Sequence, residues 1–303
     1  MPTAESILTK QHLPSRDAHD LPLSSKRFDD GGQYRIEIPS CEGPGAMQAV
    51  IAEAAVRQVP VHRVSQGSGI MLQTDHEIGE MLALGREHGI EVCLFVGPRS
   101  GWDNGAQAAS SAGRVLGASL RGADQLAFGI EDVLHGVHLG LKSILVGDLG
   151  HLKILGEMKR AGDLPKDFVL KTSVTIAAAN PATARLLEDL GATSINLPVD
   201  LSLAQIAAVR QAIDAPIDFY VESPDDFGGL VRHYETPALV RVAAPIYLKY
   251  GLRNSPGLYP SGMHIENLVV NLSRERVRRA ALSLALLKRY MPEAIASPYG
   301  VNR

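Results

Sequence analysis

The sequence repeats one kind of unit, a short apolar run that ends at a polar residue and is followed by a helical segment with its own start signal. The clearest succession is residues 168–222, where three such runs alternate with helices that begin after Asn180 and Ser202. Strands that alternate with helices of about 10–15 residues are typical of parallel βαβ units. Eight strands are expected in this way, at 34–40, 61–67, 91–99, 142–148, 168–173, 194–198, 216–222 and 246–250. The pattern predicts an α/β fold, a (β/α)8 TIM-like barrel.

The chain length fits one barrel with an extension at each end. Of the 303 residues, 33–272 are assigned to the barrel, in line with the size of about 250 residues that is common for this architecture. Residues 1–32 are polar and are predicted to form a loosely attached N-terminal arm. Residues 273–303 are predicted to form a C-terminal helix and tail that packs on the barrel, because apolar residues recur there at helical spacing. The same apolar helix leaves a homo-oligomer open.

Three local signals set the boundaries of individual helices. Thr74 lies three residues before Glu77, which is the spacing of a capping box, and Gly89 follows the last turn of that helix. The Ser223-Pro224 and Thr236-Pro237 pairs predict two short helices after the seventh strand, each with a capping hydroxyl before proline. The Thr-Pro signal also favours residues 246–250 over 238–243 as the eighth strand.

Composition excludes several classes of protein. The chain is 45% hydrophobic and 21% charged with a net charge of −3, which is typical of a soluble globular protein and lacks the basic surface that nucleic acids require. We therefore expect no nucleic-acid partner. The sequence contains neither a secretory signal nor an apolar stretch long enough for a membrane span, so a cytoplasmic protein without membrane contact is expected. With only Cys41 and Cys93, four-cysteine iron–sulfur clusters are excluded.

Polar residues near the carboxyl ends of the strands are the candidate functional groups, because active sites of such barrels lie at that face. An unpaired polar group there would cost about 1–3 kcal/mol, so each side chain needs a partner or a function. Carboxylates and cations from separate strands suit proton transfer beside an anionic or carbonyl-bearing substrate. The predicted catalytic residues are Glu37, Asp148, Lys171, Glu222 and Lys249, and the predicted substrate-binding residues are Arg63, Gln66, Arg99, Ser173 and Asn196. Arg63 and Arg99 are the expected anchors of an anionic group.

Two kinds of chemistry stay open for these residues. Lys171 or Lys249, if desolvated, could form a Schiff base with a carbonyl substrate, whereas pairing with nearby carboxylates would exclude that role. The cofactor is unknown, and a divalent metal ion is open. It would be held by Asp148 and His151 with Glu222 or Glu37, or, as a less favoured alternative, by Glu131, His135 and His138 on one helix. Cys41 follows the first strand, but no local motif pairs it with a histidine, so a small rim residue is the favoured interpretation.

The stretch from about residue 140 to 253 resembles the collagenase-like peptidase family, the U32 peptidases. The resemblance rests on LVGDLGHLKIL, on SVTIAAANPATARLLEDLGATSINLPVDLSLAQIAAVR and on DFYVESPDDFGG, which cover about a third of the chain. It implies the barrel fold and a peptidase-like activity. The family's cysteine-bearing signature after the seventh strand is replaced here by ESPDDFGG. The chain therefore resembles a barrel of this family that lacks the signature, and the resemblance assigns no catalytic residue.

Three hypotheses follow. The first is a U32-like hydrolase that acts on a small-molecule or peptide-like substrate at the carboxyl-terminal face, with Glu222 and Asp148 handling protons and both lysines stabilising negative charge. The second is a lyase or aldolase that acts on a keto acid through Lys171, Lys249 or a divalent metal. The third is a non-catalytic binding or assembly subunit that keeps the barrel. The first two require that Glu37, Asp148, Lys171, Glu222 and Lys249 meet in one pocket.

Overall fold

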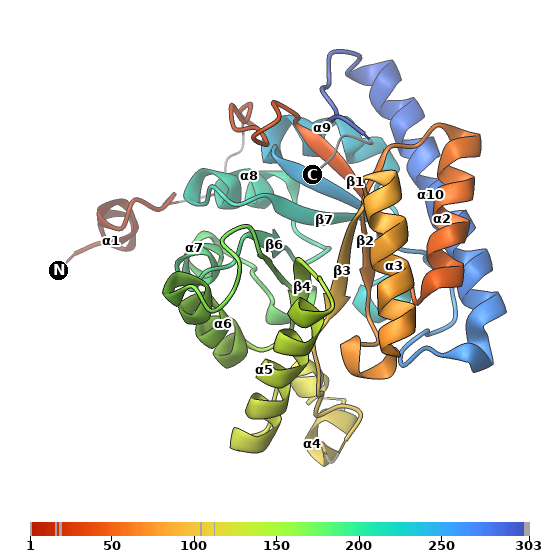
Figure 1. Ribbon diagram of the computed structural model, residues 1–303. Helices are drawn as coiled ribbons and strands as arrows, with labels where there is room; N and C mark the ends of the chain where they lie inside the picture. Colours follow the sequence, from red (N-terminus) through yellow and green to blue (C-terminus); the bar gives the residue numbers. More distant parts are fainter. Residues whose placement is uncertain (1, 16, 18–19, 104, 112, 300–303) are drawn as a thin grey trace.

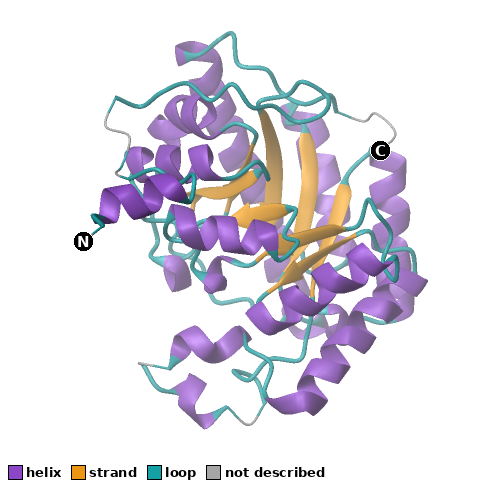
Figure 2. Cartoon of the chain, turned by 90° about the vertical axis from the view of Figure 1, so that its left-hand side faces the viewer, coloured by secondary structure: helices purple, strands orange, loops and turns teal. Residues whose placement is uncertain are grey.

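The computed structural model describes residues 2–15, 17, 20–103, 105–111 and 113–299. Within these residues, eight parallel strands close into a barrel in which each strand pairs with the next and β8 pairs with β1 (Figure 1). The strands are β1 (Tyr34–Pro39), β2 (Val61–Gln66), β3 (Glu91–Phe95), β4 (Ser143–Val146), β5 (Val169–Thr172), β6 (Ser194–Asn196), β7 (Ile217–Glu222) and β8 (Ile246–Tyr250). Figure 2 shows helices around the strands. The predicted (β/α)8 barrel is confirmed.

The helices that connect successive strands are α2 (Pro44–Arg57), α3 (Asp75–His88), α5 (Gly122–His138), α6 (Leu149–Ala161), α7 (Pro181–Asp189), α8 (Leu203–Ala212) and α9 (Thr236–Ala243). The capping box at α3 forms as predicted, since Thr74 accepts from the Glu77 amide and Glu77 accepts from the Thr74 amide. Gly89 ends α3 in the left-handed conformation, with a φ of 64°. Asn180 and Ser202 cap α7 and α8. These start signals therefore place the helices correctly.

The segment after β7 differs from the prediction. Only a short 3-10 turn, η4 (Asp225–Phe227), follows Ser223-Pro224, and a second, η5 (His233–Glu235), precedes α9. Thr236 is the first residue of α9 rather than its cap, and its buried hydroxyl has no hydrogen-bond partner. The proline at the second position still marks the helix start. Residues 246–250 do form the eighth strand.

The C-terminal helix is longer than expected. After η6 (Met263–Ile265), α10 runs from Glu266 to Tyr290, so it begins earlier than the predicted Ser273. It packs along α2 and reaches β1 and β8, at the right of Figure 1. These contacts bring α10 against the barrel.

The N-terminal arm is attached more closely than predicted. It contains a short helix, α1 (Ala4–Lys10), and the Leu13 side chain after it is buried. Phe28 is buried too and packs edge-to-face on Tyr247, with 5.3 Å between the ring centroids. The Ser24 hydroxyl donates to the Ala244 carbonyl at 2.5 Å. The second half of the arm therefore covers the amino-terminal end of the barrel.

The segment between β3 and α5 contains a four-residue helix, α4 (Ala106–Ala109), and a 3-10 turn, η2 (Arg114–Ala118). No helix in the described part of the chain is long and apolar enough to cross a membrane.

The two faces of the strands have opposite character, because successive side chains of a strand point to opposite sides. Ile36 and Ile38 on β1 are fully buried and belong to the apolar core between barrel and helices. Glu37, which lies between them, is also fully buried and meets polar side chains of β2, β5 and β8 inside the barrel. Burying each aliphatic side chain contributes about 1.5–3 kcal/mol to stability. The hydrophobic stabilisation therefore comes from the layer between the strands and the helices, whereas ion pairs occupy the interior of the barrel.

Candidate functional site

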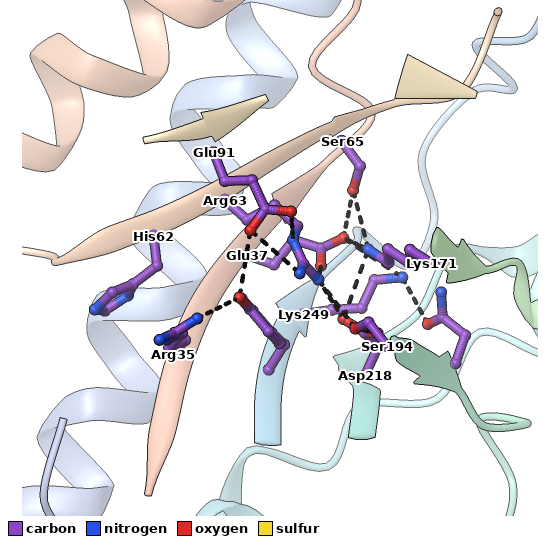
Figure 3. Close-up of polar contacts among 12 residues, drawn as sticks. Arg35, Glu37, His62, Arg63, Ser65, Glu91, Lys171, Ser194, Asp218 and Lys249 are labelled. Atoms are coloured by element: carbon purple, nitrogen blue, oxygen red, sulfur yellow. Dashed lines mark hydrogen bonds and ion pairs between the residues drawn. The ribbon is translucent and has the colours of Figure 1, made fainter. Parts of the chain in front are cut away.

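Six charged side chains from six strands meet inside the barrel, and we call them the central ion network. They are Glu37, Arg63, Glu91, Lys171, Asp218 and Lys249. Figure 3 shows these side chains pointing toward one another from the barrel wall. Three carboxylates face three cations, so the network is balanced in charge. That balance matters because an uncompensated ion in this interior would carry its full desolvation penalty.

Glu37 lies at the centre of the network. Its Oε1 atom accepts from Lys171 Nζ and from the Ser65 hydroxyl, and lies 3.6 Å from Lys249 Nζ. Its Oε2 atom accepts from an Arg63 guanidinium nitrogen at 3.3 Å. Burial alone would raise the pKa of Glu37, but the nearby Lys171, Lys249 and Arg63 cations lower it well below its ordinary value. Glu37 is therefore a permanent carboxylate.

Arg63 lies in the amino-terminal half of the barrel. Its Nε donates to Glu91 Oε1 at 2.8 Å, and another nitrogen donates to Asp218 Oδ1 at 2.9 Å. The guanidinium group also stacks on the Tyr247 ring, 3.6 Å from its centroid. Glu91 begins β3 and Asp218 is the second residue of β7, so the group points away from the carboxyl-terminal rim. The prediction that Arg63 anchors a substrate anion at the rim is wrong.

Lys249 lies at the upper edge of the network. Its Nζ donates to Asn196 Oδ1 at 2.8 Å and lies 4.1 Å from the centroid of the Tyr220 ring. The Asn196 amide nitrogen donates in turn to the Thr172 carbonyl at 2.8 Å, which fixes the orientation of the amide. Burial raises the pKa of Tyr220 above its ordinary value, so its hydroxyl keeps its proton. Lys249, Asn196 and Tyr220 thus form the layer of polar groups nearest the rim.

A hollow opens at the carboxyl-terminal face beside this layer, and we call it the rim hollow. It has a volume of about 480 Å³, and its walls come from the segments after β5, β6 and β7. The lining residues are Val174, Pro198, Val199, Asp200, Phe227, Gly228 and Leu230. Phe227 lies against Tyr220, with ring centroids 6.2 Å apart, and the Tyr220 ring lies in turn 4.1 Å from Lys249 Nζ, so Tyr220 lies between the wall of the hollow and Lys249. Asp200 is the one ionisable side chain in this wall.

Glu222 and Asp148 are not part of the central ion network, so the predicted convergence of five charged residues is wrong for these two. Asp148 caps α6 by accepting from the His151 amide at 2.8 Å, and it accepts from the Leu120 amide at 3.1 Å. Glu222 points toward α10 and lies 3.4 Å from an Arg279 guanidinium nitrogen. Both carboxylates lie near strand ends as expected, but their oxygen atoms already accept hydrogen bonds from backbone amides or pair with side chains of other elements.

Glu222 also forms a chain of contacts that resembles a hydrolytic triad. Its Oε2 lies 2.9 Å from His233 Nε2, and His233 Nδ1 lies 2.6 Å from the Ser283 hydroxyl. Ser283 is fully buried on α10, so its hydroxyl cannot reach a substrate. Burial raises the pKa of Glu222, but its hydrogen bonds to His233 and to the Arg253 amide lower it by more. The arrangement therefore joins β7 to α10 rather than supplying a nucleophile.

The predicted binding residues Gln66 and Ser173 are used by local turns. The Gln66 amide exchanges two hydrogen bonds with the backbone of Gly69, at 2.9 and 3.2 Å. Ser173 caps the short 3-10 helix η3 (Val174–Ile176) by accepting from Thr175. Arg99 follows β3 and donates to the Gly67 carbonyl, and it is not among the residues that line the rim hollow. Among the ten predicted site residues, Glu37, Lys171, Lys249 and Asn196 are the ones that the structure brings together with Arg63.

Neither proposed metal site is assembled. His135 pairs with Asp75 instead, with 2.8 Å between Nε2 and Oδ1. His151 is buried, and burial lowers its pKa to about 4. In the described ranges, no group of three or more histidine, cysteine, aspartate or glutamate side chains is placed to hold a metal ion. Cys41 and Cys93 are buried, and burial raises the pKa of both thiols, which disfavours a nucleophilic thiolate.

Sequence reasoning missed Glu91, Asp218 and Tyr220. Asp218 and Tyr220 alternate along β7 and so share its inner face, a period-2 signal that was readable in the sequence, whereas the strand register shifts before Glu222, which turns toward α10. Glu91 and Asp218 lie at strand starts, where no functional residue was sought. Burial raises the pKa of Asp218 although Lys171 and Arg63 lower it, so Asp218 holds a proton more readily than Glu37.

Comparison with known proteins supports the resemblance stated above. Residues 124–223 match the sequence model of the family described as peptidase family U32. The resemblance to U32 peptidases is therefore confirmed for this segment, which contains β4 to β7 and the four lining residues of the rim hollow from Val174 to Asp200. No curated protein matches the chain in sequence.

Several solved structures are similar to the chain. The U32 peptidase Mk0906 is 14% identical over 76% of this chain and 97% of that chain, with a TM-score of 0.43. Oxaloacetate acetylhydrolase in complex with the product oxalate is 13% identical over 88% of this chain and 85% of that chain, with a TM-score of 0.46. A protein of Burkholderia cenocepacia J2315, provisionally described as a lyase/mutase, is 14% identical over 90% and 86%, with a TM-score of 0.43.

Proposed function

We propose that this chain, whose residues 124–223 match peptidase family U32, is a hydrolase that cleaves a small peptide-like substrate at the carboxyl-terminal face of its barrel. One observation carries the proposal. The rim hollow, which has a volume of about 480 Å³ and contains Asp200, lies beside the layer formed by Tyr220, Lys249 and Asn196. Pockets of this size at this face are where such barrels bind small substrates.

The groups beside the rim hollow suit amide hydrolysis. A water molecule would add to the carbonyl carbon, the C–N bond would break, and the proton taken from water would pass to the leaving amine. Asp200 is the exposed carboxylate in the wall and is assigned the role of general base. Lys249 brings a positive charge and Tyr220 brings a protonated hydroxyl, both buried, and these suit stabilisation of a developing oxyanion. Glu37 holds Lys249 from below.

The test is turnover of a library of short peptides, measured by the appearance of free amine. Asp200→Asn and Lys249→Met are each expected to lower kcat by about 10²-fold or more, the usual contribution of a general base or an oxyanion donor. Asp226→Asn is the matched control, because Asp226 is exposed in the neighbouring loop and does not line the hollow. Glu222→Gln is expected to affect stability rather than kcat. Absence of peptide cleavage, or full activity in Asp200→Asn, would overturn the proposal.

A second candidate is lyase or aldolase chemistry on a keto acid through Lys249. The observation that favours it is that Lys249 is hydrogen-bonded to a neutral amide and lies 3.6 Å from Glu37, whereas Lys171 is hydrogen-bonded directly to Glu37 and is fully enclosed. A Schiff base would therefore form at Lys249 alone. Borohydride reduction in the presence of pyruvate, followed by peptide mass analysis, is expected to modify Lys249 under this candidate. An unmodified Lys249 excludes it, and a chain that shows neither reaction is left with the non-catalytic role.

A further inference from the structure

Arg276 on α10 is buried without a counter-ion. Its side chain is 3% exposed, and its one hydrogen bond goes to the Ser40 carbonyl at 3.4 Å. Its Nε has no hydrogen-bond partner, and within the described residues no carboxylate lies within 4.0 Å of the guanidinium group. Burial accordingly lowers the pKa of Arg276. A buried cation of this kind is costly unless an anion pairs with it.

Arg99, which follows β3, is likewise a buried cation without an ion-pair partner among the described residues. It is 9% exposed, it donates to the Gly67 carbonyl, and its Nε has no partner. The guanidinium group lies between two aromatic rings, 3.5 Å from the centroid of Phe95 and 4.1 Å from that of Trp102. These contacts hold its plane in place but supply no negative charge. Burial lowers the pKa of Arg99 to about 10.

The two arginines share their surroundings. After burial, Tyr259 and Glu42 are the groups that influence the pKa of both guanidinium groups most strongly. Glu42 is occupied, because it accepts from the amides of Gly67 and Ser68 at 2.6 and 3.0 Å. Its carboxylate therefore stabilises the turn after β2, and in the described part of the chain no ion pair within 4.0 Å joins it to Arg99 or Arg276.

Tyr259 fills the space at this part of the barrel mouth. It belongs to residues 251–262, which follow β8 and contain neither helix nor strand, and its hydroxyl lies 2.5 Å from that of Ser40. The ring packs so closely on Gly67 that a Cβ at that position would lie 2.3 Å from it. The Ser261 amide donates to the Ser68 hydroxyl at 2.8 Å, which fixes the segment over the mouth. We call residues 251–262 the covering segment.

We propose that Arg99 and Arg276 bind the free terminal carboxylate of the substrate in the volume that Tyr259 occupies, after the covering segment moves. This inference rests on the proposed function and adds the substrate class, a peptide-like molecule with an unblocked carboxyl terminus. Tyr220 lies between Lys249 and the Phe227 wall of the rim hollow, and it is near enough to Arg276 for that cation to lower the pKa of its hydroxyl and near enough to Tyr259 to raise that of the second phenol. A substrate bound in this way places its last amide bonds near Tyr220 and Lys249. A guanidinium fork matches a carboxylate in geometry and charge.

The test measures binding rather than turnover, by calorimetric titration of the Asp200→Asn protein with N-acetyl-alanyl-alanine and with the same dipeptide as its amide. The free acid is expected to bind at least about tenfold more tightly than the amide, the value of a charge-assisted hydrogen bond. Arg276→Gln and Arg99→Gln should each remove this difference, and Tyr259→Ala should strengthen binding of the acid. Arg278→Gln is the control, since Arg278 is on the same helix but exposed.

Equal binding of acid and amide by the Asp200→Asn protein, in which the further changes are made, would overturn the inference, whatever the variants do. So would retention of the difference in both arginine variants. If Arg276→Gln does not fold, Arg99→Gln and the comparison of the two ligands on the Asp200→Asn protein still decide. The two proposals fail separately. Preference for the acid without peptide cleavage overturns the hydrolase alone, whereas equally fast cleavage of free and amidated peptides overturns the carboxylate site alone.

Discussion

Replacing Glu37 by glutamine tests whether the central ion network behaves as one balanced unit. The change keeps the shape of the side chain and removes one negative charge that Lys171, Arg63 and Lys249 share. Glu91 and Asp218 would then face three cations, so one buried positive charge would be uncompensated. Breaking a buried pair by removing one partner costs about 3–5 kcal/mol. For a chain of 303 residues, that loss lowers Tm by about 5–8 °C.

The assay is thermal and urea denaturation at pH 7, followed by circular dichroism. The control is Glu157→Gln, because Glu157 pairs with Lys153 on the exposed surface of α6 at 2.8 Å, and such solvent-screened pairs contribute little to stability. A double variant, Glu37→Gln with Lys171→Met, restores the charge balance. It is expected to be more stable than the sum of the two single changes by about 2 kcal/mol or more.

The pH dependence has a defined sign. The folded pKa of Glu37 lies below its ordinary value of 4.5, so its contribution to stability is complete above that pH and is lost as pH falls further. Glu37→Gln should therefore lose less stability in acid than the parent protein. If Glu37→Gln costs no more than Glu157→Gln at pH 7, or if the double variant shows only additive losses, the barrel interior is not the charge-balanced unit described above.

Three further predictions concern other residues. Because burial lowers the pKa of His151 from 6.5 to about 4, the parent protein should lose about 2 kcal/mol of stability from this group between pH 7 and 5; His151→Gln should lack that loss in urea titrations, and His138→Gln should retain it. Burial raises the pKa of Asp132 from 3.8 to about 6, so the cost of its charge develops between these two values; Asp132→Asn should gain about 3 kcal/mol at pH 8, about half of that at pH 5 and almost nothing at pH 3 in urea titrations. Thr74→Ala removes the capping box of α3 and should cost about 1 kcal/mol by urea denaturation, whereas an unchanged midpoint would contradict the assignment of the cap.

The fold was predictable because each βα unit carries its own local signals. Thr74 and Ser202 mark helix starts through hydrogen bonds within four residues, and the apolar runs between them are long enough to be strands. Segments without such signals were predicted less well. The Thr236-Pro237 pair suggested a capped helix, but the hydroxyl of Thr236 is turned into the protein and stays unpaired. Proline determined where that helix begins, and the hydroxyl did not.

The candidate site was predictable in part, because its residues are brought together by two different means. Glu37, Lys171 and Lys249 follow from the closure of the barrel, which places charged residues near strand ends opposite one another. Arg276 is brought to the rim by the packing of α10 on α2, β1 and β8. Its sequence context is a basic helix surface, which ordinarily faces solvent. No pattern within the chain distinguishes Arg276 from the exposed Arg278 two residues later, since only the tertiary packing buries one of them.

The balance of charges inside the barrel limits where chemistry can occur. Arg63, Glu91 and Asp218 saturate one another in the amino-terminal half, so a substrate would have to break several ion pairs to react there. Lys249 is different, because a neutral amide holds it and the Tyr220 ring covers it on the side of the rim. Arg99, which follows β3, and Arg276 on α10 each donate to one backbone carbonyl and keep a buried Nε without a hydrogen-bond partner. Under the proposed function, an anionic substrate would therefore bind at the carboxyl-terminal face, and Lys249, beside the Tyr220 ring, would be the first charge of the network that it meets.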